Sequence, residues 1–249
     1  MKDNFSTQAA QYALYRPDYP EALYSYILGV CKERKNAWDC GTGNGQVAAK
    51  LSEYFEQVYA TDISQKQLSN ATKKENIHYS LQPAEHTGFA ERFFDLIVVA
   101  QAIHWFDFDL FYQEVKRTIQ PNGLLIVVGY GLLKVSPEID EIISSFYHNT
   151  IGPYWDTERR YIDEEYKTIP FPFEELSCPD LYSTLDWSFE HFMGYLNTWS
   201  AVQHFMKDKG YNPVDKLALL IAPFWAKNEI KKASFPILLR AGKVTDATS

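Results

Sequence analysis

Short apolar runs alternate with amphipathic stretches along the first 130 of the 249 residues in this chain. Runs of four to eight apolar residues bounded by turn residues are typical of buried strands, and apolar residues spaced three and four apart are typical of helices. The pattern predicts strands at 37–40, 57–62, 77–81, 94–100 and 124–129. It predicts helices at 21–32, 47–55, 64–74 and 112–119.

Beyond residue 130 this alternation stops. Residues 137–150 are spaced as a helix, and residues 151–172 are dense in Tyr, Trp, Arg and Pro. Segments 171–185 and 235–243 are expected to add two more strands. The fold class predicted is therefore α/β, with a doubly wound, mostly parallel sheet of seven strands and an aromatic-rich cap inserted before its end.

The chain divides accordingly into four parts. Residues 1–36 are expected to form an N-terminal helical cover, 37–130 the α/β core, 131–225 a cap or lid interleaved with the last strands, and 226–249 the terminal strand and tail. Within the first part, Tyr12, Tyr15 and Tyr19 surround Arg16 near two prolines. Since proline interrupts helices, we expect a short helix through Tyr15 and then an extended turn.

Composition excludes several classes of protein. The chain is 46% hydrophobic, enough for one large core with an appended subdomain. A net charge of -8 without a Lys/Arg run argues against binding nucleic acid. No signal-like start or run of 18 apolar residues is present, so neither secretion nor membrane insertion is expected. Three widely spaced cysteines fit a reducing compartment, and the location predicted is cytoplasmic.

The first strand ends in Asp39-x-Gly41-x-Gly43-x-Gly45. Glycines allow such a turn to adopt positive φ angles and to lie against a ligand at a helix start. A dinucleotide fingerprint, G-x-G-x-x-G, needs glycine where Gln46 stands. A carboxylate would repel a diphosphate but suits an ammonium group, so Asp39 favours a ligand with an amino-acid end. A plain tight turn beside a helix-facing acid is the alternative.

Other polar residues follow the ends of the next strands. Asp62 lies 17 residues beyond Gly45, at the position where an acid accepts both ribose hydroxyls of an adenosine; it also suits a helix N-cap. Ala84 and Glu85 lie on the loop where adenine would lie, although Glu85 suits a loop cap equally. Gln101 ends the fourth strand and borders the same crevice from the other side.

Together with residues 95–101 and 121–123, these motifs resemble the class I S-adenosylmethionine-dependent methyltransferases. The resemblance covers roughly residues 37–129. It implies a Rossmann-like core and S-adenosylmethionine as cofactor, with S-adenosylhomocysteine as product. The residues implied to bind the cofactor are Asp39, Gly41, Thr42, Gly43, Asp62, Ile63, Ala84, Glu85 and Gln101.

A narrower resemblance rests on Phe5, Ala9, Tyr12 and residues 16–20, 102–107 and 198–201. These look like the small-molecule methyltransferases that include the trans-aconitate methyltransferases. The acceptor implied is a small molecule, and a carboxylate in particular, methylated on oxygen by in-line displacement. A carboxylate is ionised at neutral pH and needs no base, so positioning would dominate.

Two residues are candidates for a direct role in the reaction. Arg16 suits a bidentate clamp on a carboxylate of the acceptor or of the cofactor, with an ordinary surface arginine as the alternative. His104 is the one histidine on a predicted crevice loop; it would serve as a base for an amine, phenol or thiol acceptor, or simply shape the loop.

Aromatic residues are expected to wall the acceptor pocket or to pack in a second core. They are Tyr12, Tyr15, Tyr19, Trp105 and Trp155. The other five histidines lack metal-ligand spacing, so no metal is predicted.

Two other functions stay open from the sequence. An NAD(P)-dependent oxidoreductase would share the glycine turn and the distal acid, and a non-catalytic S-adenosylmethionine-binding module would lack the acceptor pocket. The expected partner is a small-molecule acceptor, with no nucleic acid and no membrane. The chain is expected to be a monomer or a homodimer.

Overall fold

The computed structural model describes residues 15–244. The residues 1–14 and 245–249 are not described, so Tyr12 and nearly all of the helix expected before Arg16 lie outside it. Those expectations stay predictions.

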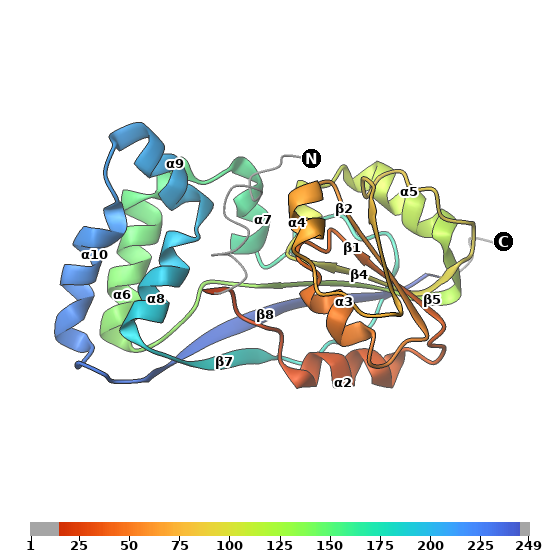
Figure 1. The fold of residues 1–249 in the computed structure, drawn as a ribbon, viewed down its shortest axis with the longest axis horizontal. Helices are drawn as coiled ribbons and strands as arrows, with labels where there is room; N and C mark the ends of the chain where they lie inside the picture. Colours follow the sequence, from red (N-terminus) through yellow and green to blue (C-terminus); the bar gives the residue numbers. More distant parts are fainter. Residues whose placement is uncertain (1–14, 245–249) are drawn as a thin grey trace.

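One sheet organises the molecule, with strand order β3-β2-β1-β4-β5-β8-β6 and with β7 paired to β8 (Figure 1). The first five strands are mutually parallel, as the alternation of apolar runs and helices predicts. Their bounds are β1 Asn36–Cys40, β2 Gln57–Asp62, β3 Ile77–Leu81, β4 Phe94–Ala100 and β5 Ile119–Tyr130.

Helices cover both faces of the sheet at β4, which explains its run of buried apolar residues from Leu96 to Val99. Alternate residues of β4 point to opposite faces: Leu96 and Val98 pack in the cluster with α2 and α3, while Ile97 and Val99 pack in the cluster with α5. The helices of the core are α2 Glu21–Val30, α3 Gln46–Leu51, α4 Gln65–Ser69 and α5 Phe108–Thr118, with the short turn η2 Ile103–Trp105 before α5.

The strand order reverses at β1, which has β2 on one side and β4 on the other. In open α/β sheets a crevice forms at such a point, outside the carboxyl ends of the strands. Asp39 near the end of β1, Asp62 at the end of β2 and Gln101 just after β4 therefore meet at this edge.

The far side of the sheet differs from the expected arrangement by one strand. The single strand expected within 171–185 is split into β6 Glu174–Glu175 and β7 Tyr182–Trp187, so the sheet has eight strands. Both pair antiparallel with β8 Lys231–Lys243, β6 at its carboxyl end and β7 at its amino end. The intervening segment contains Pro179, which cannot donate to a strand ladder.

All four core helices and β5 have different ends from those expected: α2 ends at Val30 rather than at residue 32, and β5 begins at Ile119 rather than at residue 124. α3 and α4 stop at Leu51 and Ser69, earlier than the apolar spacing suggested. α5 begins at Phe108 rather than at residue 112, because the Asp107 side chain accepts a hydrogen bond from the Leu110 N–H and caps the helix there.

The rest of the chain forms a helical cap with its own core. Long strands β5 and β8 run from the α/β core toward the cap helices (Figure 1). Aromatic side chains such as Trp187, Phe192, Tyr195, Trp199 and Phe235 fill the cap core. The cap elements are α6 Pro137–Ser145, η3 Phe146–Thr150, η4 Gly152–Tyr154, η5 Thr157–Arg159, α7 Arg160–Asp163, α8 Phe189–Asn197, α9 Ser200–Lys209, α10 Pro213–Ile221 and η6 Ala222–Phe224.

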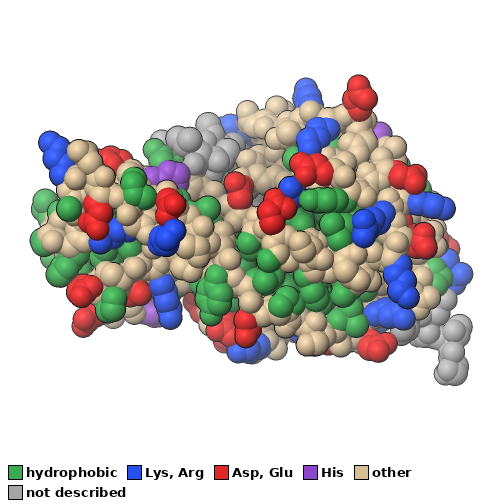
Figure 2. Space-filling view, turned by 90° about the horizontal axis from the view of Figure 1, so that it is seen from below, with side chains coloured by type: hydrophobic (Ala, Val, Ile, Leu, Met, Phe, Trp, Pro, Cys, Tyr) green, Lys and Arg blue, Asp and Glu red, His purple; other side chains and the backbone are tan. Residues whose placement is uncertain are grey.

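On the surface, acidic and basic side chains are interspersed over the face drawn in Figure 2. Within residues 15–244, none of the helices has the length and apolar character needed to cross a bilayer.

Candidate active site

The turn after β1 uses its glycines for different reasons. Gly41 and Gly45 have φ angles of 71° and 81°, in the left-handed region. A Cβ at Gly41 would lie 2.7 Å from the Cβ of Ala102, and one at Gly45 would collide with the Tyr79 hydroxyl. Gly43 also has a positive φ, but apart from its chain neighbours no atom of residues 15–244 lies within 4 Å of the position of its missing Cβ. The backbone at Gly43 therefore faces open space.

That open space is a cavity at the carboxyl edge of the sheet, with about 930 Å³ of unfilled volume including its mouth. It brings together residues from the N-terminal segment, the glycine turn and the ends of β2, β4 and β5. Among the predicted residues, those lining it are Arg16, Tyr19, Asp39, Gly41, Thr42, Gly43, Asp62, Ile63, Gln101 and Trp105.

Asp39 is a buried acid on the cavity wall, with 1% of its surface exposed. Its Oδ2 accepts hydrogen bonds from the Thr42 hydroxyl at 2.5 Å and the Ala48 N–H at 2.9 Å. Its Oδ1 is also buried and accepts none from residues 15–244. Burial raises the pKa of Asp39 to about 7 against the lowering effect of these two bonds. An unpaired buried carboxylate oxygen is costly, so a cationic group in the cavity would satisfy it.

Asp62 holds the glycine turn and the next helix start together. Its Oδ2 accepts the Gly43 N–H and its Oδ1 accepts the Ser64 N–H, each at 2.8 Å. The carboxylate also lines the cavity, and carboxylate oxygens accept hydrogen bonds from hydroxyl groups. The cap of α4 is Ser64, whose hydroxyl accepts from the Gln67 N–H, and not Asp62.

Gln101 lies in a left-handed conformation with φ 53°, which is costly for a residue with a side chain. Two contacts fix its amide: Nε2 donates to the Tyr130 carbonyl at 3.2 Å, and Oε1 accepts from the Tyr166 hydroxyl at 3.3 Å. The strained turn thus places Gln101 in the wall between this cavity and a smaller chamber described below.

Ala84 and Glu85 do not line the main cavity. Ala84 is buried, and the Glu85 carboxylate accepts the Asp107 N–H at 3.2 Å, at the start of α5. This contact matches the loop-capping alternative for Glu85. The loop that carries both residues is nevertheless fixed beside the sheet edge.

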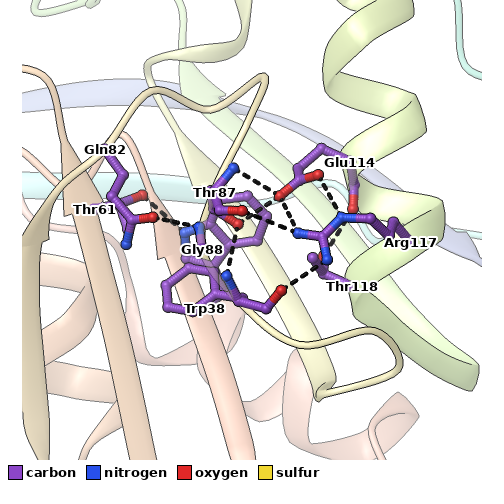
Figure 3. A network of polar contacts seen from close by, with 9 residues as sticks. Trp38, Thr61, Gln82, Thr87, Gly88, Glu114, Arg117 and Thr118 are labelled. Carbon is purple, nitrogen blue, oxygen red and sulfur yellow. Dashed lines mark hydrogen bonds and ion pairs between the residues drawn. The ribbon is translucent and has the colours of Figure 1, made fainter.

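A polar network anchors that loop to α5 (Figure 3). The Oε1 of Glu114 accepts from the backbone N–H and the hydroxyl of Thr87, at 2.9 and 2.5 Å, and Arg117 donates to both Glu114 oxygens. Arg117 also donates to the carbonyls of Thr87 and Phe89. Although burial opposes ionisation, the bonds from Arg117 and Thr87 hold the pKa of Glu114 below its usual value.

Glu114→Gln is expected to lower the free energy of unfolding by about 1–3 kcal/mol, because it leaves Arg117 without its charge partner. The loop at 82–89 should loosen at the same time. Chemical denaturation measures the loss, and hydrogen exchange of the Gly88 amide, which donates to Gln82 Oε1 at 2.7 Å, reports the loop. Exposed Glu164→Gln is the matched control. Equal stability of the two variants would contradict a role for the network.

A second, smaller chamber adjoins the cavity and shares Arg16, Gln101 and Trp105 with it. It has about 470 Å³ of unfilled volume including its mouth. The core contributes η2 and the cap contributes η5, α7 and the first residue of α9. Its other lining residues are His104, Trp155, Asp156, Arg159, Ile162 and Ser200.

Arg16 lies between the two cavities and joins core to cap. Its Nη1 donates to the Tyr130 hydroxyl at 2.8 Å, and its Nη2 donates to the Thr198 carbonyl at 3.3 Å. The guanidinium also lies over the ring of Tyr195, 5.5 Å from its centroid. Arg16 is therefore an interior residue that positions the N-terminal segment, and not an ordinary surface arginine.

His104 is 6% exposed and borders the chamber. Burial, and then the charge of Arg159, lower the pKa of His104 to about 3, so its imidazole is neutral. Its Nδ1 has no hydrogen-bond partner among residues 15–244. A group with so low a pKa is a weak general base, so His104 suits a hydrogen bond to a ligand better than proton removal.

The remaining predicted pocket residues divide between chamber and cap. Trp155 lines the chamber. Tyr15 lines neither cavity, because its ring packs on Gly194 of α8 and lies 5.1 Å from the ring of His191. Within residues 15–244 no three His, Cys, Asp or Glu side chains are grouped closely enough to hold a metal ion.

Sequence reasoning missed several lining residues. Tyr130 reaches the main cavity from the end of β5, whereas Arg159 and Ser200 reach the chamber through the packing of the cap. The one sequence feature that pointed toward Arg159 was the high content of Arg, Tyr and Trp in residues 151–172. This feature applies equally to Arg160.

Comparison with known proteins agrees with the geometry. A model of the methyltransferase domain matches residues 38–127. A Dictyostelium discoideum protein named as a methyltransferase is 36% identical, over 97% of this chain and 95% of its own. A structure described as a type II methyltransferase from Anaeromyxobacter dehalogenans has a TM-score of 0.87 and 37% identity, covering 93% of this chain and 99% of that chain.

A third relative, from Saccharomyces cerevisiae, is named as an S-adenosylmethionine-dependent methyltransferase and is 30% identical over 48% of this chain and 44% of its own. These matches favour a methyltransferase over the two alternative functions, an NAD(P)-dependent oxidoreductase and a non-catalytic S-adenosylmethionine-binding module. The chain belongs to the methyltransferase family, as a class I enzyme that uses S-adenosylmethionine as its methyl donor.

Proposed function

We propose that this enzyme methylates a small-molecule carboxylic acid on oxygen, giving a methyl ester. The cavity at the sheet edge would hold the cofactor, and the adjoining chamber would hold the acceptor. The observation that carries this proposal is the chamber itself, which shares a wall with the cofactor cavity and is lined by Arg16 and Arg159.

The residues of the larger cavity fit S-adenosylmethionine. The buried Oδ1 of Asp39, which accepts no hydrogen bond from residues 15–244, suits the ammonium of the methionine end, and the Asp62 carboxylate suits the two ribose hydroxyls. Gly43 leaves backbone open to the ligand. When bound, S-adenosylmethionine supplies an electrophilic methyl group on a positively charged sulfur.

The chamber lies between η2 of the core and the cap elements η5, α7 and α9, so an acceptor held there would be enclosed by both parts of the protein. Arg16, Gln101 and Trp105 belong to both cavities, so an acceptor held there would lie directly beside the methyl donor. Holding the two reactants in line and excluding water is then the main contribution of the protein.

The chemistry of the chamber favours an acceptor that is already an anion. An amine, phenol or thiol must lose a proton to react well, and the pKa of His104, lowered to about 3 by burial and Arg159, makes it a poor acceptor of that proton. A carboxylate has a pKa near 4 and needs no base at neutral pH. The resemblance to the trans-aconitate methyltransferases supports the same class of acceptor.

A screen with S-adenosylmethionine labelled in its methyl group tests the proposal. Small carboxylic acids, phenols and amines are offered in parallel, and the products are then treated with mild alkali. Methyl esters release labelled methanol under these conditions, whereas methyl ethers and methylamines keep the label. We expect alkali-labile product from acids alone. Label transferred only to amines or phenols would reject the carboxylate acceptor while leaving methyl transfer intact.

A further inference from the structure

We infer that Arg159 is the residue that recognises the acceptor's anionic group, and that it selects anionic over neutral acceptors. This inference rests on the proposed function for the identity of the acceptor. It departs from the expectation that Arg16 forms the clamp.

The two arginines of the chamber differ in what their terminal nitrogens do. Both Nη atoms of Arg16 donate to the protein, to the Tyr130 hydroxyl and to the Thr198 carbonyl. Among residues 15–244, Arg159 donates through Nε to the Tyr147 hydroxyl at 2.7 Å, and the same Nε lies 3.6 Å from Oδ1 of Asp163 as an ion pair. Its two Nη atoms donate to none of the residues 15–244, and its side chain is 19% exposed at the chamber wall. Arg159 therefore keeps the pair of donors that a carboxylate binds bidentately.

The surroundings of Arg159 hold its guanidinium in place. Its Cζ lies 4.6 Å from the ring centroid of Trp155 and 5.4 Å from that of Tyr147. The hydroxyl of Tyr147, which receives the Nε hydrogen bond, donates in turn to Asp163 at 2.5 Å. Stacking on two rings and a hydrogen bond at Nε fix the plane of the guanidinium, and thus of its two Nη donors, before a ligand binds. This reduces the entropy lost on binding.

The charge balance of the chamber also favours an anion. Its lining contains two arginines and one carboxylate, Asp156, while the fourth titratable group, His104, is neutral. Ser200 brings the N-terminus of the ten-residue helix α9 to the same wall. The first N–H groups of a helix carry partial positive charge, so this end adds to the attraction. A neutral acceptor could accept hydrogen bonds from these groups but would lack the attraction between opposite charges.

Binding of simple probes tests the inference apart from catalysis. Benzoate and succinate, with benzamide and succinamide as neutral counterparts, are titrated into the enzyme saturated with S-adenosylhomocysteine, and quenching of tryptophan fluorescence is followed. We expect saturable quenching by the acids alone. Arg159→Gln should raise their dissociation constants about tenfold, Arg159→Lys less, and Arg160→Gln not at all, since Arg160 is exposed on the next position.

Calorimetric affinity for S-adenosylhomocysteine should stay within twofold in all variants, which also shows that they fold. Equal probe affinity of the wild type and Arg159→Gln, equal weakening by Arg159→Gln and Arg160→Gln, or no saturable binding of either acid to the wild type would each overturn the inference. With the acid found in the labelling screen, Arg159→Gln should raise KM about tenfold and change kcat less. If no acid is methylated, the proposed function fails, and the probe titration still decides whether Arg159 binds anions.

Discussion

Replacing Asp39 with asparagine is expected to weaken the binding of S-adenosylhomocysteine about 100-fold, because a hydrogen bond between charged groups in a buried site is worth up to about 3 kcal/mol. Asparagine keeps the shape and one oxygen to accept from Thr42 and Ala48. It loses the charge of the oxygen that faces the cavity. Isothermal titration calorimetry measures the change.

The pH dependence of binding gives a second measure of Asp39. Burial raises the pKa of Asp39 to about 7, so most of the free protein carries a protonated Asp39 below that pH. The ammonium group of the ligand binds the ionised form of Asp39. Affinity in the wild type should rise about tenfold per pH unit below 7 and level off above, until the ligand amine itself deprotonates near pH 8. Asp39→Asn should remove the rise below pH 7.

The same raised pKa predicts an opposite effect on stability. The folded protein holds this proton more tightly than the unfolded chain, so the contribution of Asp39 to stability falls as pH rises from about 4 to about 7. Asp39→Asn should therefore raise the Tm of the ligand-free protein at pH 8 while reducing the Tm increase caused by the ligand. Asp95→Asn is the control, because Asp95 accepts from the N–H groups of Lys35 and Asn36 near the opposite edge of the sheet. If Asp39→Asn and Asp95→Asn changed the Tm values in the same way, the raised pKa and the ligand contact could not be assigned to Asp39.

Asp62→Ala is expected to weaken cofactor binding by about 1.5–3 kcal/mol, or roughly 10- to 150-fold, through loss of two hydrogen bonds to ribose hydroxyls. Part of any loss will come from the protein, since the carboxylate also accepts the N–H groups of Gly43 and Ser64. A change in the ligand can separate the loss of hydrogen bonds to the ribose from the loss of these contacts within the protein.

A thermodynamic cycle with S-adenosylhomocysteine and an analogue lacking both ribose hydroxyls makes that separation. If Asp62 binds the ribose, the analogue binds weakly to the wild type, and Asp62→Ala lowers its affinity little further. Additive losses would mean that Asp62 acts only by holding the glycine turn. Asp186→Ala on β7 removes an exposed ion pair with Lys232 of β8 and should leave both affinities unchanged.

The α/β core was predictable because its signals are local. Strands β2, β3 and β4 have the bounds that the apolar runs predicted, and the parallel order follows from their alternation with helices. The predictions were wrong where other interactions compete with the apolar pattern. The Asp107 cap started α5 earlier, and pairing at both ends of β8 produced two strands from one expected segment.

The sequence by itself determined the methyltransferase core, since an apolar strand, an acid and three alternating glycines specify a turn and the charge beside it without reference to the rest of the chain. Only the tertiary structure decided which side chains face the acceptor chamber. Arg159 and Arg160 are adjacent and identical in type, yet one lines the chamber and the other is exposed on α7. Their difference arises from how the aromatic cap packs against the end of β4, and packing between distant segments leaves no local pattern in the chain.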